Sequence, residues 1–236
     1  LVMKTAINGG SKKFTTSKIY NSISMQRVIP AILEQSVSDI QEKLDRVAAF
    51  VELIQLDIAD GLFVPEEVMN DPGVLDLIQT TAAIDLHLMI ELPEVVIEKW
   101  LHPVVRRISI HIEASEDSNA SIEKIKEADK EVFLAINPET PIKKLEPYAE
   151  IIDGVLIMGV HPGYGGQEFI PSTLEKVKDA RILLPERTIA VDGGVKEGIA
   201  IKLFEAGADQ VAMGTGLFSA TNLEKYIKKI NSFKDK

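Results

Sequence analysis

The sequence predicts a (β/α)8 barrel, and three observations lead to this fold class. From Val28 onward, short runs rich in β-branched residues alternate with longer segments of helical spacing. Eight such strand and helix pairs follow one another in a chain of 236 residues, which fits a closed barrel better than an open doubly wound sheet. Polar side chains also share one face of several expected strands, as they do when strands line a barrel interior.

The expected elements follow in order along the chain. The strands should occupy residues 28–33, 53–58, 83–90, 107–112, 132–137, 154–160, 187–191 and 210–214. Helical stretches lie between them, such as 196–206 and 36–50, and in 36–50 apolar residues recur at spacings of three and four. Residues 28–236 should therefore form one barrel domain. Residues 1–27 carry basic but no acidic side chains and show no clear period, so we expect a loosely ordered extension.

Composition excludes several function classes. Without cysteine, the chain has no disulfide scaffold, thiolate nucleophile or cysteine-bound zinc. The formal charge of −10 argues against nucleic-acid and membrane partners, and any bound anion must be held by local geometry. No apolar run approaches the ~18–20 residues of a membrane span, and the first residues lack a secretory hydrophobic block. We expect a cytoplasmic protein with a small-molecule partner, and a homo-oligomeric state is left open.

Polar and apolar residues alternate along four of the expected strands. One face is apolar, and the other carries Gln55, Asp57, Asp85, His87, Met89, Ser109, His111, Glu113, Thr188, Ala190 and Asp192. Because the outer face of a barrel strand must be apolar to seat its helix, we expect this second set in the lumen. Its polar residues lie near the carboxyl ends of their strands, where barrel active sites are built.

Three loops that contain glycine follow the last three expected strands. They are Gly163-Tyr164-Gly165-Gly166-Gln167, Gly193-Gly194 and Gly214-Thr215-Gly216. Glycine lets backbone amides approach a bound anion closely. Barrels commonly bind phosphate between the loops after strands 7 and 8, so the sequence predicts a phosphate site there.

Seven motifs occur in order between residues 60 and 209. They are Asp60-Gly61-Leu62-Phe63-Val64-Pro65, His87-Leu88-Met89, His111-Ile112-Glu113, Asn137-Pro138-Glu139-Thr140-Pro141, Pro162-Gly163-Tyr164-Gly165-Gly166-Gln167, Val191-Asp192-Gly193-Gly194-Val195 and Ala206-Gly207-Ala208-Asp209. Through them the chain from Val28 to about Phe218 resembles the ribulose-phosphate 3-epimerases. The resemblance implies an isomerase of the pentose phosphate pathway that converts D-ribulose 5-phosphate to D-xylulose 5-phosphate.

The resemblance also implies roles for individual residues. Asp57 and Asp192 match two aspartates that face opposite sides of the reacting carbon, where one removes a proton and the other returns it through an enediolate. One divalent metal ion, Zn, Fe, Mn or Mg, would be held by Asp57, His87 and Asp192 and would stabilise the enediolate. The implied substrate and phosphate contacts are His87, Gly163, Tyr164, Gly165, Gly166, Gly193, Gly194, Gly214 and Thr215.

Four residues depart from the pattern of the resembled family. Gln55 stands where the family has its other metal-ligating histidine, so we expect weakened metal binding in which Gln55 contributes its amide oxygen or holds a water. An amide oxygen suits Mg or Mn better than Zn. Ala31 replaces a substrate-binding serine, Ala59 a methionine and Glu66 an asparagine.

These departures leave two alternatives open and argue against a third. Space beside Ala31 and Ala59 would favour an epimerase for a six-carbon ketose phosphate such as allulose 6-phosphate. A decayed metal site would leave a non-catalytic sugar-phosphate-binding homologue. The decarboxylase and hexulose-phosphate synthase group shares the barrel but needs a lysine two residues after the strand-two aspartate, where this chain has Ala59.

Overall fold

The computed structural model describes residues 26–233. The expected extension, residues 1–27, therefore lies almost entirely outside the described residues. Among the helices of residues 26–233, none has both the length and the apolar character needed to cross a membrane.

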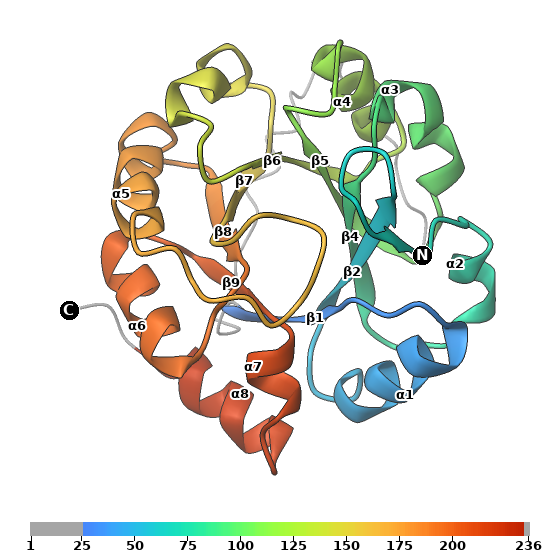
Figure 1. The fold of residues 1–236 in the computed structure, drawn as a ribbon, viewed down its shortest axis with the longest axis vertical. Helices are drawn as coiled ribbons and strands as arrows, with labels where there is room; N and C mark the ends of the chain where they lie inside the picture. The colour runs from blue at the N-terminus through green and yellow to red at the C-terminus, as the bar shows by residue number, and fades with distance from the viewer. Residues whose placement is uncertain (1–25, 234–236) are drawn as a thin grey trace, which may run out of the picture.

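Eight parallel strands close into a barrel, with the helices around the outside (Figure 1). The strands are β1 (Val28–Ile32), β2 (Leu53–Asp60), β4 (Ala83–Met89), β5 (Val105–His111), β6 (Glu131–Ile136), β7 (Gly154–Met158), β8 (Thr188–Asp192) and β9 (Gln210–Met213). The ring closes because β1 pairs in parallel with both β2 and β9. The predicted fold class is confirmed, and each predicted strand ends within about two residues of the observed one.

The helical layer is uneven around the barrel. Its members are α1 (Val37–Val47), α2 (Val74–Leu77), α3 (Pro93–Val96), η1 (Ile97–Trp100), α4 (Ser118–Glu127), η2 (Ile142–Tyr148), α5 (Thr173–Leu183), α6 (Glu197–Ala206), α7 (Thr215–Phe218) and α8 (Leu223–Asn231). The predicted helix 36–50 ends early, at Val47, and begins where Ser36 caps the backbone N–H of Asp39. Connections after β2, β4 and β6 contain only short helical segments.

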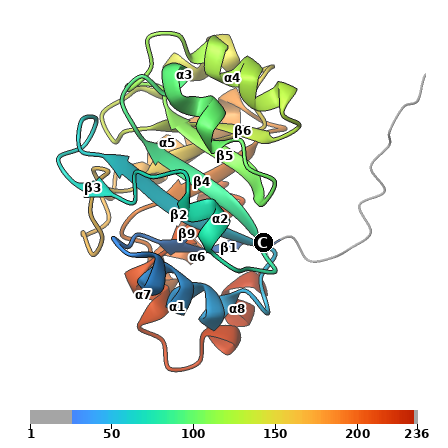
Figure 2. The ribbon, with the colours of Figure 1, turned by 90° about the vertical axis from the view of Figure 1, so that its right-hand side faces the viewer.

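One element was not predicted. The two-residue strand β3 (Glu67–Val68) pairs antiparallel with the end of β2. Figure 2 shows it on the same side of the barrel as the loop that follows β7. Asp60 holds the hairpin, because its carboxylate accepts hydrogen bonds from the backbone N–H groups of Leu62, Phe63 and Glu91.

The predicted alternation along the strands is confirmed. Ile54, Leu56 and Ile58 belong to the main apolar core that the helices cover. A separate apolar cluster, made of Phe133, Ala135, Leu156, Met158 and Ala190, fills one side of the barrel interior. The opposite side carries buried polar residues of β2, β4 and β5. The lumen is therefore divided into an apolar and a polar half.

Candidate functional site

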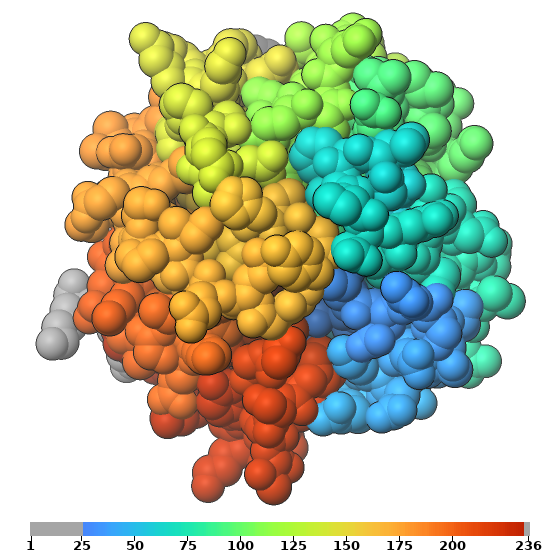
Figure 3. All heavy atoms as spheres, in the orientation of Figure 1, coloured from blue at the N-terminus to red at the C-terminus, as the bar shows by residue number. Residues whose placement is uncertain are grey.

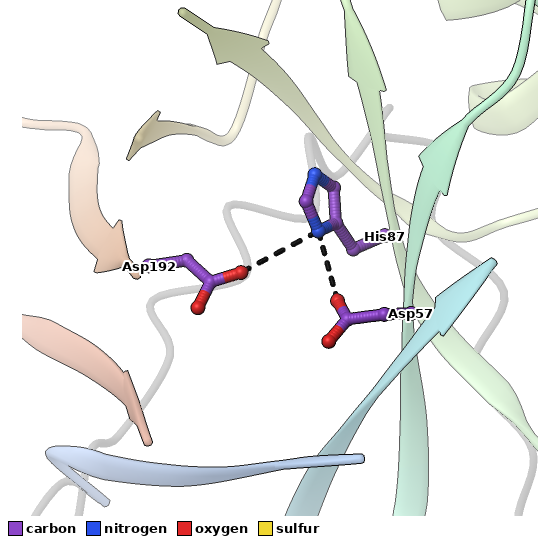
Figure 4. A group of neighbouring side chains, drawn as sticks. All are labelled: Asp57, His87 and Asp192. Carbon is purple, nitrogen blue, oxygen red and sulfur yellow. Dashed lines mark hydrogen bonds and ion pairs between the residues drawn. The ribbon is translucent and has the colours of Figure 1, made fainter. Parts of the chain in front are cut away.

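Three ionisable side chains meet at the carboxyl ends of their strands. Asp57 on β2 lies opposite His87 on β4 in the strand register, and Asp192 ends β8. His87 Nδ1 lies 2.9 Å from Asp57 Oδ1 and 3.5 Å from Asp192 Oδ2 (Figure 4). One potential ligand atom from each residue lies within 4.8 Å of the others, so the group could hold a metal ion. The prediction that these three residues lie together is confirmed.

Gln55 also belongs to this cluster and lies two residues before Asp57 on β2. Its side chain is buried, and Nε2 donates hydrogen bonds to Asp57 Oδ1 at 2.7 Å and to Asp192 Oδ2 at 2.8 Å. The position beside Asp57 is the one that strand alternation predicts. The amide nitrogen faces the two carboxylates, so it holds them together in the way a cation would.

The cluster carries more negative than positive charge. Burial and the nearby charge of Asp192 raise the pKa of Asp57. Burial lowers the pKa of His87, but hydrogen bonds to Asp192 and Asp57 and their charges outweigh that effect and raise it to about 10. Even with His87 protonated, the buried Asp57 and the partly buried Asp192 face one imidazolium, an arrangement that attracts a further cation.

His87 also contacts a second histidine on its other side. Its Nε2 lies 2.9 Å from Nε2 of His111, whose Nδ1 lies 3.4 Å from Glu113 Oε2. Burial lowers the pKa of His111 to about 4, so this imidazole is neutral. His111 and Glu113 lie outside the cavity described next.

A cavity of about 680 Å³ opens above the cluster at the mouth of the barrel. The loop after β7, in light orange, covers much of this mouth in Figure 3. The lining includes Asp57, His87, Asp192, Gly163, Tyr164, Gly165, Gly166, Gly193, Gly194, Gly214 and Thr215. Every predicted site residue except Gln55 therefore borders one cavity.

Sequence reasoning missed two cations in the lining. Lys43 on α1 and Lys196 before α6 both border the cavity beside the glycine-containing loops. Lys43 forms an ion pair with Glu34, which also lines the cavity. Lys196 follows directly on the Gly193-Gly194 loop and could have been noticed. Lys43 could not, because its approach to the mouth depends on how α1 packs.

The two alanines that replace larger family residues behave differently. Ala31 lines the cavity. Ala59 is fully buried in a cluster with Val64, Val68 and Met89, so no open space lies beside it. Of the two positions where a lost side chain would favour a six-carbon substrate, only Ala31 therefore borders the cavity.

A sequence model of the ribulose-phosphate 3 epimerase family matches residues 27–218. The chain belongs to the ribulose-phosphate 3-epimerase family. The protein is 35% identical to ribulose-phosphate 3-epimerase of Synechocystis sp. over 88% of this chain and 94% of the relative. It is 32% identical to that of Bacillus subtilis over 89% of this chain and 100% of the relative. Members of this family are isomerases that act on sugar phosphates.

Solved structures of lower identity share the fold. A 3-hexulose-6-phosphate synthase superposes with a TM-score of 0.63 at 16% identity, covering 87% of this chain and 98% of the other. Orotidine 5′-phosphate decarboxylase from Pyrococcus horikoshii superposes with a TM-score of 0.61 at 17% identity, covering 86% of this chain and 97% of the other. These likenesses support the barrel alone. Cytoplasmic location stays a prediction, and the oligomeric state stays open.

Proposed function

We propose that this protein interconverts D-ribulose 5-phosphate and D-xylulose 5-phosphate by inverting carbon 3. The observation that carries the proposal is the pair Asp57 and Asp192, which extend from β2 and β8 into the floor of one cavity. Inversion needs an acid–base group on each face of the carbon, and two carboxylates on separate strands supply them.

The two aspartates exchange roles in each turnover. One carboxylate removes the C3 proton, and the electrons of the broken C–H bond form the C2=C3 double bond of an enediolate. The carboxyl group on the other face then donates its proton to C3, and the C2 carbonyl reforms. The proton lost and the proton gained reside on different aspartates, so the reverse reaction uses the same pair in the opposite order.

The donor set fits a divalent metal ion. Asp57, His87 and Asp192 would hold it, and Gln55 would join them only with its amide oxygen in place of the nitrogen that now faces the carboxylates. When bound, the ion would acidify C3 and stabilise the negative charge of the enediolate. Two carboxylates, an imidazole and an amide favour Mn or Mg over Zn, because an amide oxygen is a hard ligand.

The glycine-containing loops would hold the phosphate at the far end of the cavity. Gly166 has a φ of +79°, a conformation that glycine adopts without strain and that exposes backbone N–H groups to an anion. Lys196 adds positive charge at the same end of a protein whose net charge is −10, while Lys43 there is paired with Glu34. This arrangement suits a phosphorylated sugar better than a free one.

Incubation with D-ribulose 5-phosphate in D2O tests the proposal. We expect D-xylulose 5-phosphate with deuterium at C3, observed by proton NMR, because the returned proton comes from a solvent-exchanged carboxyl group. Absence of both product and C3 exchange with every divalent metal would favour the non-catalytic sugar-phosphate-binding homologue.

A six-carbon substrate is the second candidate, supported by the missing side chain at Ala31 in the cavity wall. Measuring kcat/KM for allulose 6-phosphate beside ribulose 5-phosphate separates the two. A higher value for allulose 6-phosphate would replace the five-carbon assignment without changing the chemistry.

A further inference from the structure

A chain of hydrogen-bonding side chains leads from His87 away from the cavity. It runs from His87 Nε2 to His111 Nε2 at 2.9 Å, and from His111 Nδ1 to Glu113 Oε2 at 3.4 Å. Each side chain projects from β4 or from β5 and its end, inside the polar half of the barrel. The sequence motif His111-Ile112-Glu113 thus lies behind the candidate metal site and not in it.

Glu113 is fixed at the outer end of this chain. The backbone N–H of Asn137 donates to Glu113 Oε1 at 2.8 Å, and the Thr140 side chain also hydrogen-bonds to the carboxylate. Burial raises the pKa of Glu113, but these bonds and the one from His111 lower it overall, so Glu113 is a carboxylate. Residues of the motif that begins at Asn137 therefore fix the position of the Glu113 carboxylate.

His111 cannot easily turn or exchange its partners for water. Its side chain is completely buried, and the Phe63 ring lies against it with the centroids 4.8 Å apart. A carboxylate can only accept hydrogen bonds, so Nδ1 of His111 must carry the proton that faces Glu113. The two Nε2 atoms lie 2.9 Å apart, so one donates and the other accepts, and because His111 holds its proton on Nδ1, its Nε2 is the acceptor.

The tautomer of His87 follows from this order. Because His111 Nε2 accepts, His87 Nε2 must donate, and that nitrogen keeps its proton. When His87 is neutral, its lone pair therefore lies on Nδ1, the nitrogen that faces Asp57 and Asp192. Partners behind a ligating histidine commonly fix its tautomer and ring orientation in this way.

We propose that His111 and Glu113 are positioning residues that hold His87 with its Nδ1 free to ligate a metal ion, an inference that rests on the metal site of the proposed function. Neither residue lines the cavity, so both act through His87 and do not contact the substrate.

Glu113→Gln tests the direction of the chain. A glutamine can donate its amide N–H to His111 Nδ1, which would reverse both histidine tautomers and leave the proton of His87 on the ligating nitrogen. Glu113→Asp keeps the carboxylate. Glu131→Gln is the matched control, because Glu131 is a carboxylate on the neighbouring strand that contacts Arg107 and lies outside the cavity.

Two measurements on the full chain test the proposal, calorimetry on metal-stripped protein and NMR on the Zn²⁺-loaded wild type. Titration calorimetry with Zn²⁺ and Mn²⁺ should show affinity lowered about 10–100-fold in Glu113→Gln, largely retained in Glu113→Asp and unchanged in Glu131→Gln. Nitrogen-15 NMR of the Zn²⁺-loaded wild type should show a protonated, slowly exchanging Nε2 of His87. Inorganic phosphate affinity and the thermal unfolding midpoint should stay unchanged, which separates positioning from a loss of structure.

These measurements distinguish failure of the positioning role from failure of the metal site. If Glu113→Gln binds both ions as the wild type does, or the wild-type NMR signal shows His87 unprotonated at Nε2, the positioning role is wrong and the metal site stands. If the wild type binds neither ion, the proposed metal site fails and the positioning role fails with it.

Discussion

Two buried polar clusters lie inside the same barrel and differ in what their charges need. The first, called the closed-end cluster, lies toward the amino-terminal ends of the strands, away from the cavity. In it, Arg107 Nη1 lies 3.1 Å from Asp85 Oδ2 and 2.9 Å from Gln210 Oε1. Its Nε reaches Glu131 at 3.3 Å, and its guanidinium lies 4.0 Å from the Phe133 ring centroid. At the mouth, the carboxylates of Asp57 and Asp192 accept hydrogen bonds from the Gln55 amide and face Nδ1 of His87.

The closed-end cluster has a permanent cation, whereas the mouth cluster has one only while His87 is protonated, and His87 must give up the proton on Nδ1 to bind a metal ion there. Arginine stays protonated, so Asp85 has a cation beside it at every ordinary pH. The five side chains of that cluster also lie outside the cavity. The mouth cluster places two carboxylates against one histidine and opens to a cavity. Buried polar side chains alone do not identify an active site, but an unbalanced charge at an accessible strand end does.

Removing either mouth carboxylate should have the largest effect. Asp57→Asn and Asp192→Asn should each lower kcat by more than ~10⁴-fold, beyond the loss typical of one acid–base group, because each also supplies a metal ligand. In D2O each variant should retain C3 exchange in only one of the two epimers, and a different one in each variant. Near-normal turnover in either variant would contradict the two-aspartate mechanism.

Gln55→His should raise activity, because it gives the mouth cluster the fourth strong metal ligand that it lacks. We expect tighter Zn binding and a gain in kcat of ~10²–10³-fold, the value of one electrostatic contact to a developing oxyanion. Gln55→Leu is the control, since it removes the bridge between Asp57 and Asp192 without adding a ligand. Equal kcat and Zn affinity in the wild type and in Gln55→His would show that this position does not limit the enzyme.

Substitutions in the closed-end cluster should lower stability and leave catalysis almost unchanged. Arg107→Met leaves Asp85 buried without its cation, so the free energy of unfolding in urea should fall by ~3–5 kcal/mol. The kcat of the folded protein should stay close to that of the wild type. Arg107→Lys, which keeps the charge but loses the forked geometry, should be intermediate. A selective loss of kcat at unchanged stability would make this cluster part of the site.

A smaller effect is expected at the phosphate loop. A Cβ on Gly166 would meet no atom within 4 Å, so Gly166→Ala tests the cost of its φ of +79° alone. Gly166→Asp adds a negative charge beside the phosphate and should raise KM by at least about tenfold over Gly166→Ala, equivalent to ~1.4 kcal/mol. Equal KM values in the two variants would show that this loop does not bind the phosphate. Gly194 is unsuited to the test, because a Cβ there would lie 2.6 Å from the Phe169 backbone nitrogen.

Much of the barrel and of its mouth could be predicted because the signals are local. Alternation along β2, β4 and β8 needs only neighbouring residues, and it placed Gln55, Asp57, His87 and Asp192 in the lumen. The closed-end cluster joins Arg107 to Gln210, residues 103 positions apart, and no local pattern reports such a contact. The strand β3 is two residues long, too short to show a period.

The orientation of individual groups was also beyond sequence reasoning. Alternation places Gln55 beside Asp57, but it does not say whether the amide nitrogen or oxygen faces the carboxylates. It also places His111 and Glu113 in the lumen without showing that they contact His87 from behind. Such details depend on how hydrogen-bond donors and acceptors are matched across several strands.

The central claim is that the charge imbalance at the mouth makes this cluster a metal-dependent epimerisation site. The most direct test is the rate of D-xylulose 5-phosphate formation by chelator-stripped protein to which Mn²⁺, Mg²⁺, Fe²⁺ or Zn²⁺ is returned singly, with Asp192→Asn as the control. The account predicts that turnover falls on stripping and returns with at least one ion, Mn²⁺ or Mg²⁺ restoring more than Zn²⁺, and that Asp192→Asn stays inactive throughout. Full turnover by the stripped protein, or none with any ion, would contradict it.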